Sequence, residues 1–428
     1  MIRIHRTTET LKSFFKHTRT AASVALCFCV SVSVVQLAAQ TPAAWPQWRG
    51  PARDGVASAF TPPPAWPAQL RKRWEVTVGA GHSSPVVAGN RVILHSRQGN
   101  REIVAAYDLQ TGTQLWQDGI EAPYSVNPAA RAHGPGPKST PTIAGGRVFT
   151  LGVSGIFSAH DLDTGKLLWR KNAPPNPPEY GTSSSPIVDG ALVIAFLGGQ
   201  NAGALTAMDA ATGAVKWEWK GDGPGYSSPI IAMFGGPKQV IVQSQTRVVG
   251  VGAVDGRLLW EVPLKTPYEQ NVVTPLVVGD LLISAGLENP TLGLWITAGL
   301  GKGWSATPRW RNEDVSMYMS SPAASGTTLF GLSNKNRGQF FAIDVKTGKT
   351  LWTTKGREAE NASIVRAGDY LLLSTTNSEL IVARANAQRY EEVRRYSIAN
   401  SAVWAHPAYA GRTIVVKDVD KLIAWATD

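Results

Sequence analysis

The chain has 428 residues, with 42 Gly, 28 Pro and 15 Trp, and only 17% of its residues are charged. This composition argues against a disordered chain and against a coiled coil, and it is typical of many short strands joined by tight turns. The formal net charge is +11, but the basic residues are scattered and form no run interleaved with aromatic residues, so no nucleic-acid binding is predicted.

Residues 1–39 have the order of a secretory signal peptide, a basic segment followed by an apolar run over residues 21–39. An uncleaved anchor is the alternative, because the run is about as long as a short membrane span. A lipoprotein is not expected, since Leu26 and not a small residue precedes Cys27. Cys27 and Cys29 both lie in this run, so the mature chain has no disulfide. We therefore expect an exported protein, periplasmic or secreted.

Residues 40–69 form a segment rich in Pro and Trp, in which Arg49 and Asp54 could pair. We interpret it as a strap laid on the side of the folded body. A flexible tether is the alternative, but a tether would not need three tryptophans.

The remaining chain, residues 70–428, repeats a unit of roughly 45 residues, which is close to the length of a propeller blade. Each unit begins with a Ser/Thr-Pro pair that opens a short apolar strand. The pair occurs at Ser84-Pro85, Thr140-Pro141, Ser185-Pro186, Ser228-Pro229, Thr274-Pro275 and Ser321-Pro322, with degenerate copies at Ala362-Ser363 and His406-Pro407. Eight starts predict eight blades.

A second pattern, Ala-x-Asp-x-x-Thr-Gly-x-x-x-Trp, ends most units. The Asp caps a strand by accepting hydrogen bonds from turn amides, and the Gly takes the positive φ of the turn. The Trp on the next strand is expected to pack sideways into the neighbouring blade. These docking residues are Trp116, Trp169, Trp217, Trp260, Trp310 and Trp352, of which Trp260 and Trp310 belong to incomplete copies of the pattern, and blade seven has none.

The last unit ends one strand short, and residues 70–78 resemble the missing strand, with Trp74 as its docking residue. Closure by the N-terminal strand would leave no open sheet edge. The sequence therefore predicts an all-β fold, an eight-bladed β-propeller of four-stranded antiparallel blades.

The loops before each Ser/Thr-Pro pair should reach the mouth of the central channel, where repeats vary without harming the packing. They form the candidate ligand-binding funnel, which contains His82, His133, Lys138, Tyr180, Tyr226, Glu269, Asn271, Tyr318, Asn361 and Trp404. The inserted loop 120–138 is the candidate lid. The alternative is that the aromatic rings only plug the channel and that the polar groups satisfy loop backbone. No metal site and no catalytic residue are assigned.

The repeated pattern resembles the tryptophan-docking motif of pyrroloquinoline quinone (PQQ) propeller repeats, so the chain is identified as a member of the quinoprotein alcohol dehydrogenase-like superfamily. That resemblance implies the propeller fold. Its enzymes hold PQQ on the axis with Ca²⁺, a catalytic Asp and, typically, a disulfide of adjacent cysteines. The superfamily also includes a non-enzymatic propeller of outer-membrane assembly. The mature chain lacks the cysteines, and no cofactor is predicted.

We therefore expect a non-catalytic, monomeric binding or scaffold protein of the cell envelope, whose partner is an envelope protein or a small polar ligand. The alternative is a quinoprotein dehydrogenase that uses PQQ and Ca²⁺. A hydrolase or lyase that uses funnel carboxylates and histidines is a third hypothesis, which no sequence motif supports directly.

Overall fold

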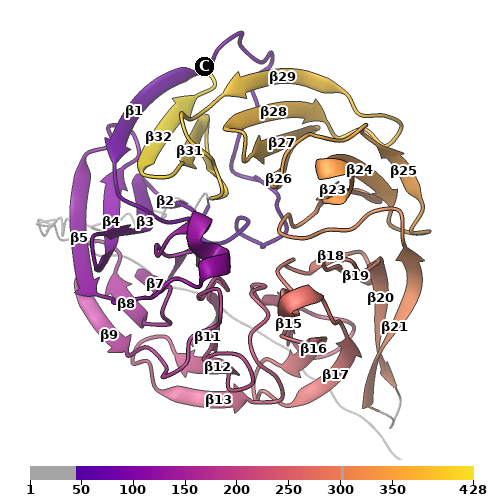
Figure 1. The fold of residues 1–428 in the computed structure, drawn as a ribbon, viewed down its shortest axis with the longest axis horizontal. Helices are drawn as coiled ribbons and strands as arrows, with labels where there is room; N and C mark the ends of the chain where they lie inside the picture. Colours follow the sequence, from indigo (N-terminus) through magenta and orange to yellow (C-terminus); the bar gives the residue numbers. More distant parts are fainter. Residues whose placement is uncertain (1–44, 300–302) are drawn as a thin grey trace, which may run out of the picture. The chain divides into compact units, whose positions relative to one another are not determined.

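A computed structural model describes residues 45–299 and 303–428. The described chain folds into eight four-stranded antiparallel sheets around a central channel (Figure 1), which confirms the predicted eight-bladed propeller. The predicted export signal lies outside the described residues. Within the described ranges no helix is both long enough and apolar enough to span a bilayer.

Blades one to seven each use four consecutive strands, numbered outward from the channel. Blades one to four contain β2 (Val86–Ala88), β3 (Arg91–Gln98), β4 (Arg101–Asp108), β5 (Gln114–Glu121); β6 (Thr142–Ala144), β7 (Arg147–Leu151), β8 (Phe157–Asp161), β9 (Leu167–Lys171); β10 (Ile187–Asp189), β11 (Leu192–Leu197), β12 (Ala204–Asp209), β13 (Val215–Trp219); and β14 (Ile230–Ala232), β15 (Gln239–Gln243), β16 (Arg247–Gly252), β17 (Leu258–Pro263).

Blades five to seven contain β18 (Leu276–Val278), β19 (Leu281–Ser284), β20 (Thr291–Gly299), β21 (Gly303–Asn312); β22 (Ala323–Ser325), β23 (Thr328–Ser333), β24 (Gln339–Asp344), β25 (Thr350–Thr353); and β26 (Ala362–Ala367), β27 (Tyr370–Thr375), β28 (Glu379–Arg384), β29 (Glu392–Ser397). Three short 3₁₀ helices lie in loops, namely η1 (Pro128–His133), η2 (Pro267–Glu269) and η3 (Lys335–Arg337). The middle strands are covered on both faces, and for this reason they read as continuous apolar runs in the sequence.

Blade eight joins the two ends of the described chain. β30 (Ala408–Ala410), β31 (Thr413–Lys417) and β32 (Lys421–Ala426) form its inner strands, and β1 (Arg71–Thr77) is its outer strand. β1 pairs antiparallel with β32 in a register that places Trp74 opposite Ala424. The N-terminal strand therefore closes the ring, as predicted.

Tryptophan rings join neighbouring blades at the outer strands. Six indole N–H groups donate to a turn carbonyl of the next blade at 2.7–3.1 Å, from Trp74, Trp116, Trp169, Trp217, Trp310 and Trp352. The Trp74 ring also lies against Gly112, where an added Cβ would approach the ring to 2.7 Å. The turn glycine is therefore needed both for its positive φ of 73° and for the space that the tryptophan occupies.

Two blades depart from this pattern. The Trp260 indole donates to Gln239 Oε1 of its own blade, because blade five carries the long strands β20 and β21 in place of the Asp-Thr-Gly turn. In blade seven, which has no docking tryptophan, Tyr396 donates its hydroxyl to Pro67 O and lies beside the Trp66 ring. The N-terminal segment thus supplies the aromatic packing that blade seven lacks.

The Ser/Thr-Pro pairs form a second set of joints, close to the channel. The Ser185 hydroxyl accepts from the Thr140 N–H and the Ser84 hydroxyl accepts from the His406 N–H, each at 2.9 Å. Similar bonds join blade three to four and blade five to six. The hydroxyl of the pair therefore bridges one blade to the next.

In the N-terminal segment, Trp45 pairs with Val87 and Val56 with Arg366 on innermost strands, whereas Trp66 and Pro67 contact Tyr396 on the outer strand β29. The segment therefore crosses the centre of the wheel before it reaches an outer strand (Figure 1), whereas the predicted strap lies on the side alone.

Arg49 and Arg53 are each 1% exposed. Arg53 donates to Ser185 O at 3.1 Å and Pro229 O at 2.8 Å, and also to Pro186 O. Arg49 donates to backbone carbonyls of blade six. Both guanidinium groups thus satisfy carbonyl oxygens that the strand ends leave free.

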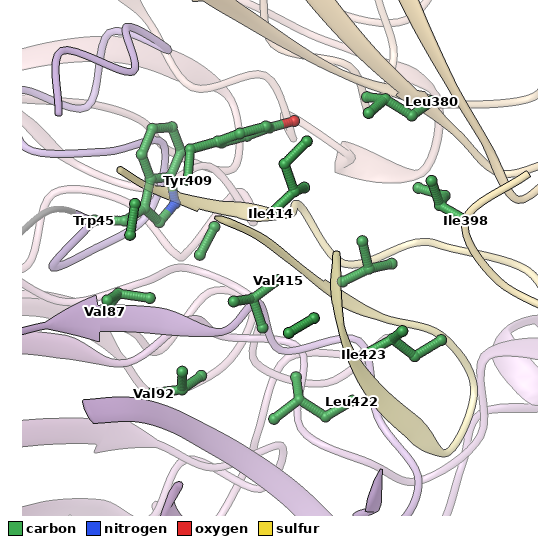
Figure 2. Packing of buried hydrophobic residues seen from close by; sticks show 14 of the residues in the cluster. Trp45, Val87, Val92, Leu380, Ile398, Tyr409, Ile414, Val415, Leu422 and Ile423 are labelled. Atoms are coloured by element: carbon green, nitrogen blue, oxygen red, sulfur yellow. The ribbon is translucent and has the colours of Figure 1, made fainter. Parts of the chain in front are cut away.

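The backbone of this segment aims the two arginines inward. Arg49 and Arg53 both have a positive φ, at 60° and 58°, and so do Gly50 and Gly55. The expected Arg49–Asp54 ion pair is not among the salt bridges of the described residues; the Asp54 carboxylate instead accepts from the Val56 N–H. At the start of the segment, Trp45 is completely buried and meets the Tyr409 ring edge-on at 5.2 Å (Figure 2).

Candidate functional site

A pocket of about 540 Å³ occupies the mouth of the channel. This volume is within the range of sites for small organic ligands. Trp48, from the N-terminal segment that crosses the channel, is part of its lining. The walls come from the loops that precede the innermost strands, and the lining consists of Trp48, His82, Ala129, Ala130, His133, Lys138, Tyr180, Ser183, Tyr226, Ser228, Tyr268, Gln270, Val272, Thr274, Leu287, Tyr318, Met319, Asn361, Trp404 and His406.

The structure brings eight of the ten predicted funnel residues to this pocket and places two outside its lining. Glu269 accepts hydrogen bonds from Gln200 Nε2 at 3.0 Å and Gln245 Nε2 at 2.6 Å. Asn271 is completely buried, and its amide donates to three loop carbonyls. Both residues therefore hold loops in place, as the alternative interpretation of the polar groups anticipates.

Two histidines and a tryptophan form one wall. The ring centroids of His133 and Trp404 are 4.7 Å apart, and those of His82 and His133 are 5.6 Å apart. Burial, the neighbouring His133 and nearby lysine charges lower the pKa of His82 to about 3. Burial also lowers the pKa of His133. Both imidazoles are therefore neutral near pH 7.

Tyrosines form the opposite wall. The rings of Tyr180 and Tyr226 are 5.9 Å apart, and the Tyr318 hydroxyl donates to Gln270. Tyr226 and Tyr268 both have a positive φ, at 78° and 57°. Such backbone strain in non-glycine residues is concentrated at functional sites in proteins. It therefore supports a binding role for these two loops.

Lys138 supplies the pocket's ammonium group. Its Nζ donates to Tyr180 O at 2.6 Å. Burial lowers the pKa of Lys138 to about 8, with no carboxylate contributing to the shift. The described residues therefore leave this cation without an acidic partner inside an aromatic pocket.

The loop predicted as a lid contains η1, which overlies the centre of the wheel in Figure 1. Ala129, Ala130 and His133 of this loop line the pocket. The Asn127 side chain accepts from Ala129 N at 2.8 Å and donates to Glu179 at 3.1 Å, which ties the loop to blade three.

Trp48, like Gln270, is one of the lining residues that sequence reasoning missed. Its indole donates to Thr274 Oγ1 at 2.9 Å, and its ring lies 4.2 Å from that of His406. The three tryptophans in residues 40–69 were a signal of tight packing. They gave no indication that one of them lines the channel.

The pocket residues do not fit a calcium-bound quinone. Calcium takes oxygen ligands and favours carboxylates, yet no Asp or Glu is among the lining residues of this described pocket. Across the described ranges, no three His, Cys, Asp or Glu side chains converge closely enough to hold a metal ion. The ammonium of Lys138 would also repel a cation.

Comparison with known proteins gives a consistent family match. The family model described as "Outer membrane protein assembly factor BamB" matches residues 67–125 and 100–354. The assembly factor BamB of Moranella endobia is 28% identical over 223 residues, which cover 49% of this chain and 51% of that protein. BamB of Yersinia pestis is 26% identical over 81% of this chain and 86% of that protein.

The solved structures that have a similar fold include enzymes. A quinohemoprotein alcohol dehydrogenase from Pseudomonas putida HK5 superposes with a TM-score of 0.66, at 13% identity, over 90% of this chain and 80% of that chain. At this level of identity the likeness concerns the fold alone, because one fold hosts many unrelated functions.

Proposed function

Since the chain belongs to the family described as outer membrane protein assembly factor BamB, within the PQQ-repeat propellers, we propose that it is a non-catalytic scaffold protein of the cell envelope. It binds another envelope component at the mouth of its channel. The observation that carries this proposal is the pocket itself, which has aromatic walls, neutral histidines and no carboxylate among its described lining residues.

The contrast with the dehydrogenase alternative favours this function. An aromatic surface with a few polar groups is typical of the buried centre of a binding interface. Polar side chains of the lining, among them Lys138, Gln270 and Asn361, can orient a partner, whereas the carboxylates that a calcium-bound quinone would need are not among the described lining residues.

Affinity capture from envelope extract tests the proposal. We expect the purified protein to recover a reproducible partner, and a Trp404→Ala variant to lose most of it because the pocket wall is removed. An exposed change on the far rim, Lys346→Ala, is the matched control and should retain the partner.

Failure to recover any partner with either protein would contradict the scaffold function. Dye reduction that depends on added PQQ and Ca²⁺ would instead establish the dehydrogenase alternative.

A further inference from the structure

We propose that the mouth pocket binds a small aromatic monocarboxylate, whose ring lies between the aromatic walls and whose carboxylate pairs with Lys138. This ligand class deepens the proposed function of the same site. The lining residues do not fit a calcium-bound quinone, and their shape and charge favour this ligand class instead.

The first argument is shape and surface. Trp404 and His133 form one wall of the pocket, Tyr180 and Tyr226 form the other, and Trp48 adds a further aromatic ring to the lining. Flat aromatic walls favour a planar ring, which gains contact area and offset or edge-on ring contacts. A pocket of about 540 Å³ suits a molecule of one or two rings.

The second argument is charge. Lys138 lies in the wall, and its only hydrogen-bond partner among the described residues is the Tyr180 carbonyl. An ammonium has three donors, so two remain for a ligand. A carboxylate would pair with this partly buried charge through a charge-assisted hydrogen bond, which is stronger than a neutral one.

The third argument is that the pocket favours a ligand with a single negative charge, the one that pairs with Lys138. His82 and His133 are neutral at pH 7, because burial lowers the pKa of both. Glu360 is exposed, and its negative charge acts to raise the pKa of both His133 and Tyr318. This charge would disfavour a second negative group on the ligand. A monocarboxylate therefore fits this charge pattern better than a polyanion.

The experiment is titration calorimetry of the full chain with 2-naphthoate and with its uncharged amide, 2-naphthamide. We expect 2-naphthoate to bind at least tenfold more tightly than the amide, since a hydrogen bond to a charged group is worth about that factor. Lys138→Met should remove this difference by weakening 2-naphthoate alone, while Trp404→Ala should weaken both probes.

Exposed Lys346→Met is the matched control and should bind as the wild type does. Melting temperatures of all variants verify that each is folded. A pH series adds an independent readout: between pH 7 and 9 the affinity for 2-naphthoate should fall as Lys138 loses its proton, while that for the amide stays constant.

Equal affinities for the two probes, or no 2-naphthoate binding at millimolar concentration, would overturn the proposal. Binding of PQQ that requires Ca²⁺ would overturn it as well. Because partner capture and probe binding are separate measurements, loss of probe binding with intact capture refutes only this ligand class, and not the scaffold function.

Discussion

The central channel has one end filled by the N-terminal segment and one end open at the mouth pocket, and each end holds cationic side chains. Arg49 and Arg53 at the filled end are fully buried, whereas Lys138 at the open end is partly buried. At the filled end, Arg49 and Arg53 donate to carbonyls of several blades. At the open end, Lys138 has a single carbonyl partner in an aromatic pocket. A buried cation with its donors satisfied contributes to stability, whereas one with free donors is available to a ligand. The same kind of charge therefore indicates structure at one end and binding at the other.

The largest effect is expected at the filled end. Arg53→Ala removes donors from carbonyls of blades three and four, and leaves those oxygens buried. We expect the free energy of unfolding to fall by about 3 kcal/mol or more, measured by chemical denaturation. Arg257→Ala, on an exposed turn, is the control. A loss below about 1 kcal/mol would remove the distinction between the two ends.

Trp48 lies where the two ends meet, so its replacement should affect both. Trp48→Ala loses the bond to Thr274 and the contact with His406, and we expect a destabilisation of about 2 kcal/mol, because the ring is only partly buried. Trp48→Phe keeps an aromatic ring and should lose about 1 kcal/mol. Thermal melts of both variants check the order, and equal losses would mean that the ring contributes nothing beyond its N–H.

Acid should destabilise the protein through His406, which is 2% exposed and beside the filled end. Burial, followed by the charge of Arg49, lowers its pKa to about 3. The unfolded chain takes up this proton near pH 6.5, so the stabilisation is complete above pH 6.5 and is lost as the pH falls toward 3. Between pH 7 and 5 we expect His406 to account for a loss of about 1–2 kcal/mol, and His406→Gln should remove this share of the total loss.

The matched measurement is the unfolding free energy of wild type and His406→Gln at both pH values. The other groups whose pKa is lowered, including His82, Glu102 and Asp118, remain in both proteins. Their effect cancels in the comparison. Identical pH slopes would contradict a neutral buried His406.

The smallest effect is expected at the open end, and two lysines provide a direct contrast. Burial lowers the pKa of both Lys138 and Lys417 to about 8. Lys417 donates to three carbonyls, at 3.2, 2.7 and 2.9 Å, so Lys417→Met should destabilise by about 2 kcal/mol. Lys138→Met should change stability by less than about 0.5 kcal/mol. Similar losses in calorimetric melts would show that Lys138 is structural.

The blades were predictable because their information is local. Asp108 accepts from the amides of Gln110 and Thr111 at 2.9 Å, within one turn of the chain. The same short pattern returns at Asp161, Asp209 and Asp344. A repeat of this kind can be read from spacing alone, and the missing strand of the last blade then predicts the role of β1.

The channel was not predictable from local patterns. Arg53 contacts oxygens that lie 132 and 176 positions away in the sequence. Backbone carbonyls carry no sequence pattern that would indicate an arginine partner. The funnel was predictable in part. The position of Tyr180 and Tyr318 before Ser/Thr-Pro pairs correctly predicted that they line the pocket. The same rule could not predict that the Asn271 side chain donates to loop carbonyls instead.

The pairing of β1 with β32 also has a consequence for how fast the chain can fold. Arg71 and Asp428 form an ion pair across 357 positions of sequence, whereas every other blade pairs consecutive strands. Contacts of such long separation slow folding, because the entropy of closing the loop is lost before the contact forms. During vectorial synthesis, β1 emerges before its partner exists. Ring closure is therefore expected to be the rate-limiting step, and β1 must stay unpaired until the last blade is complete.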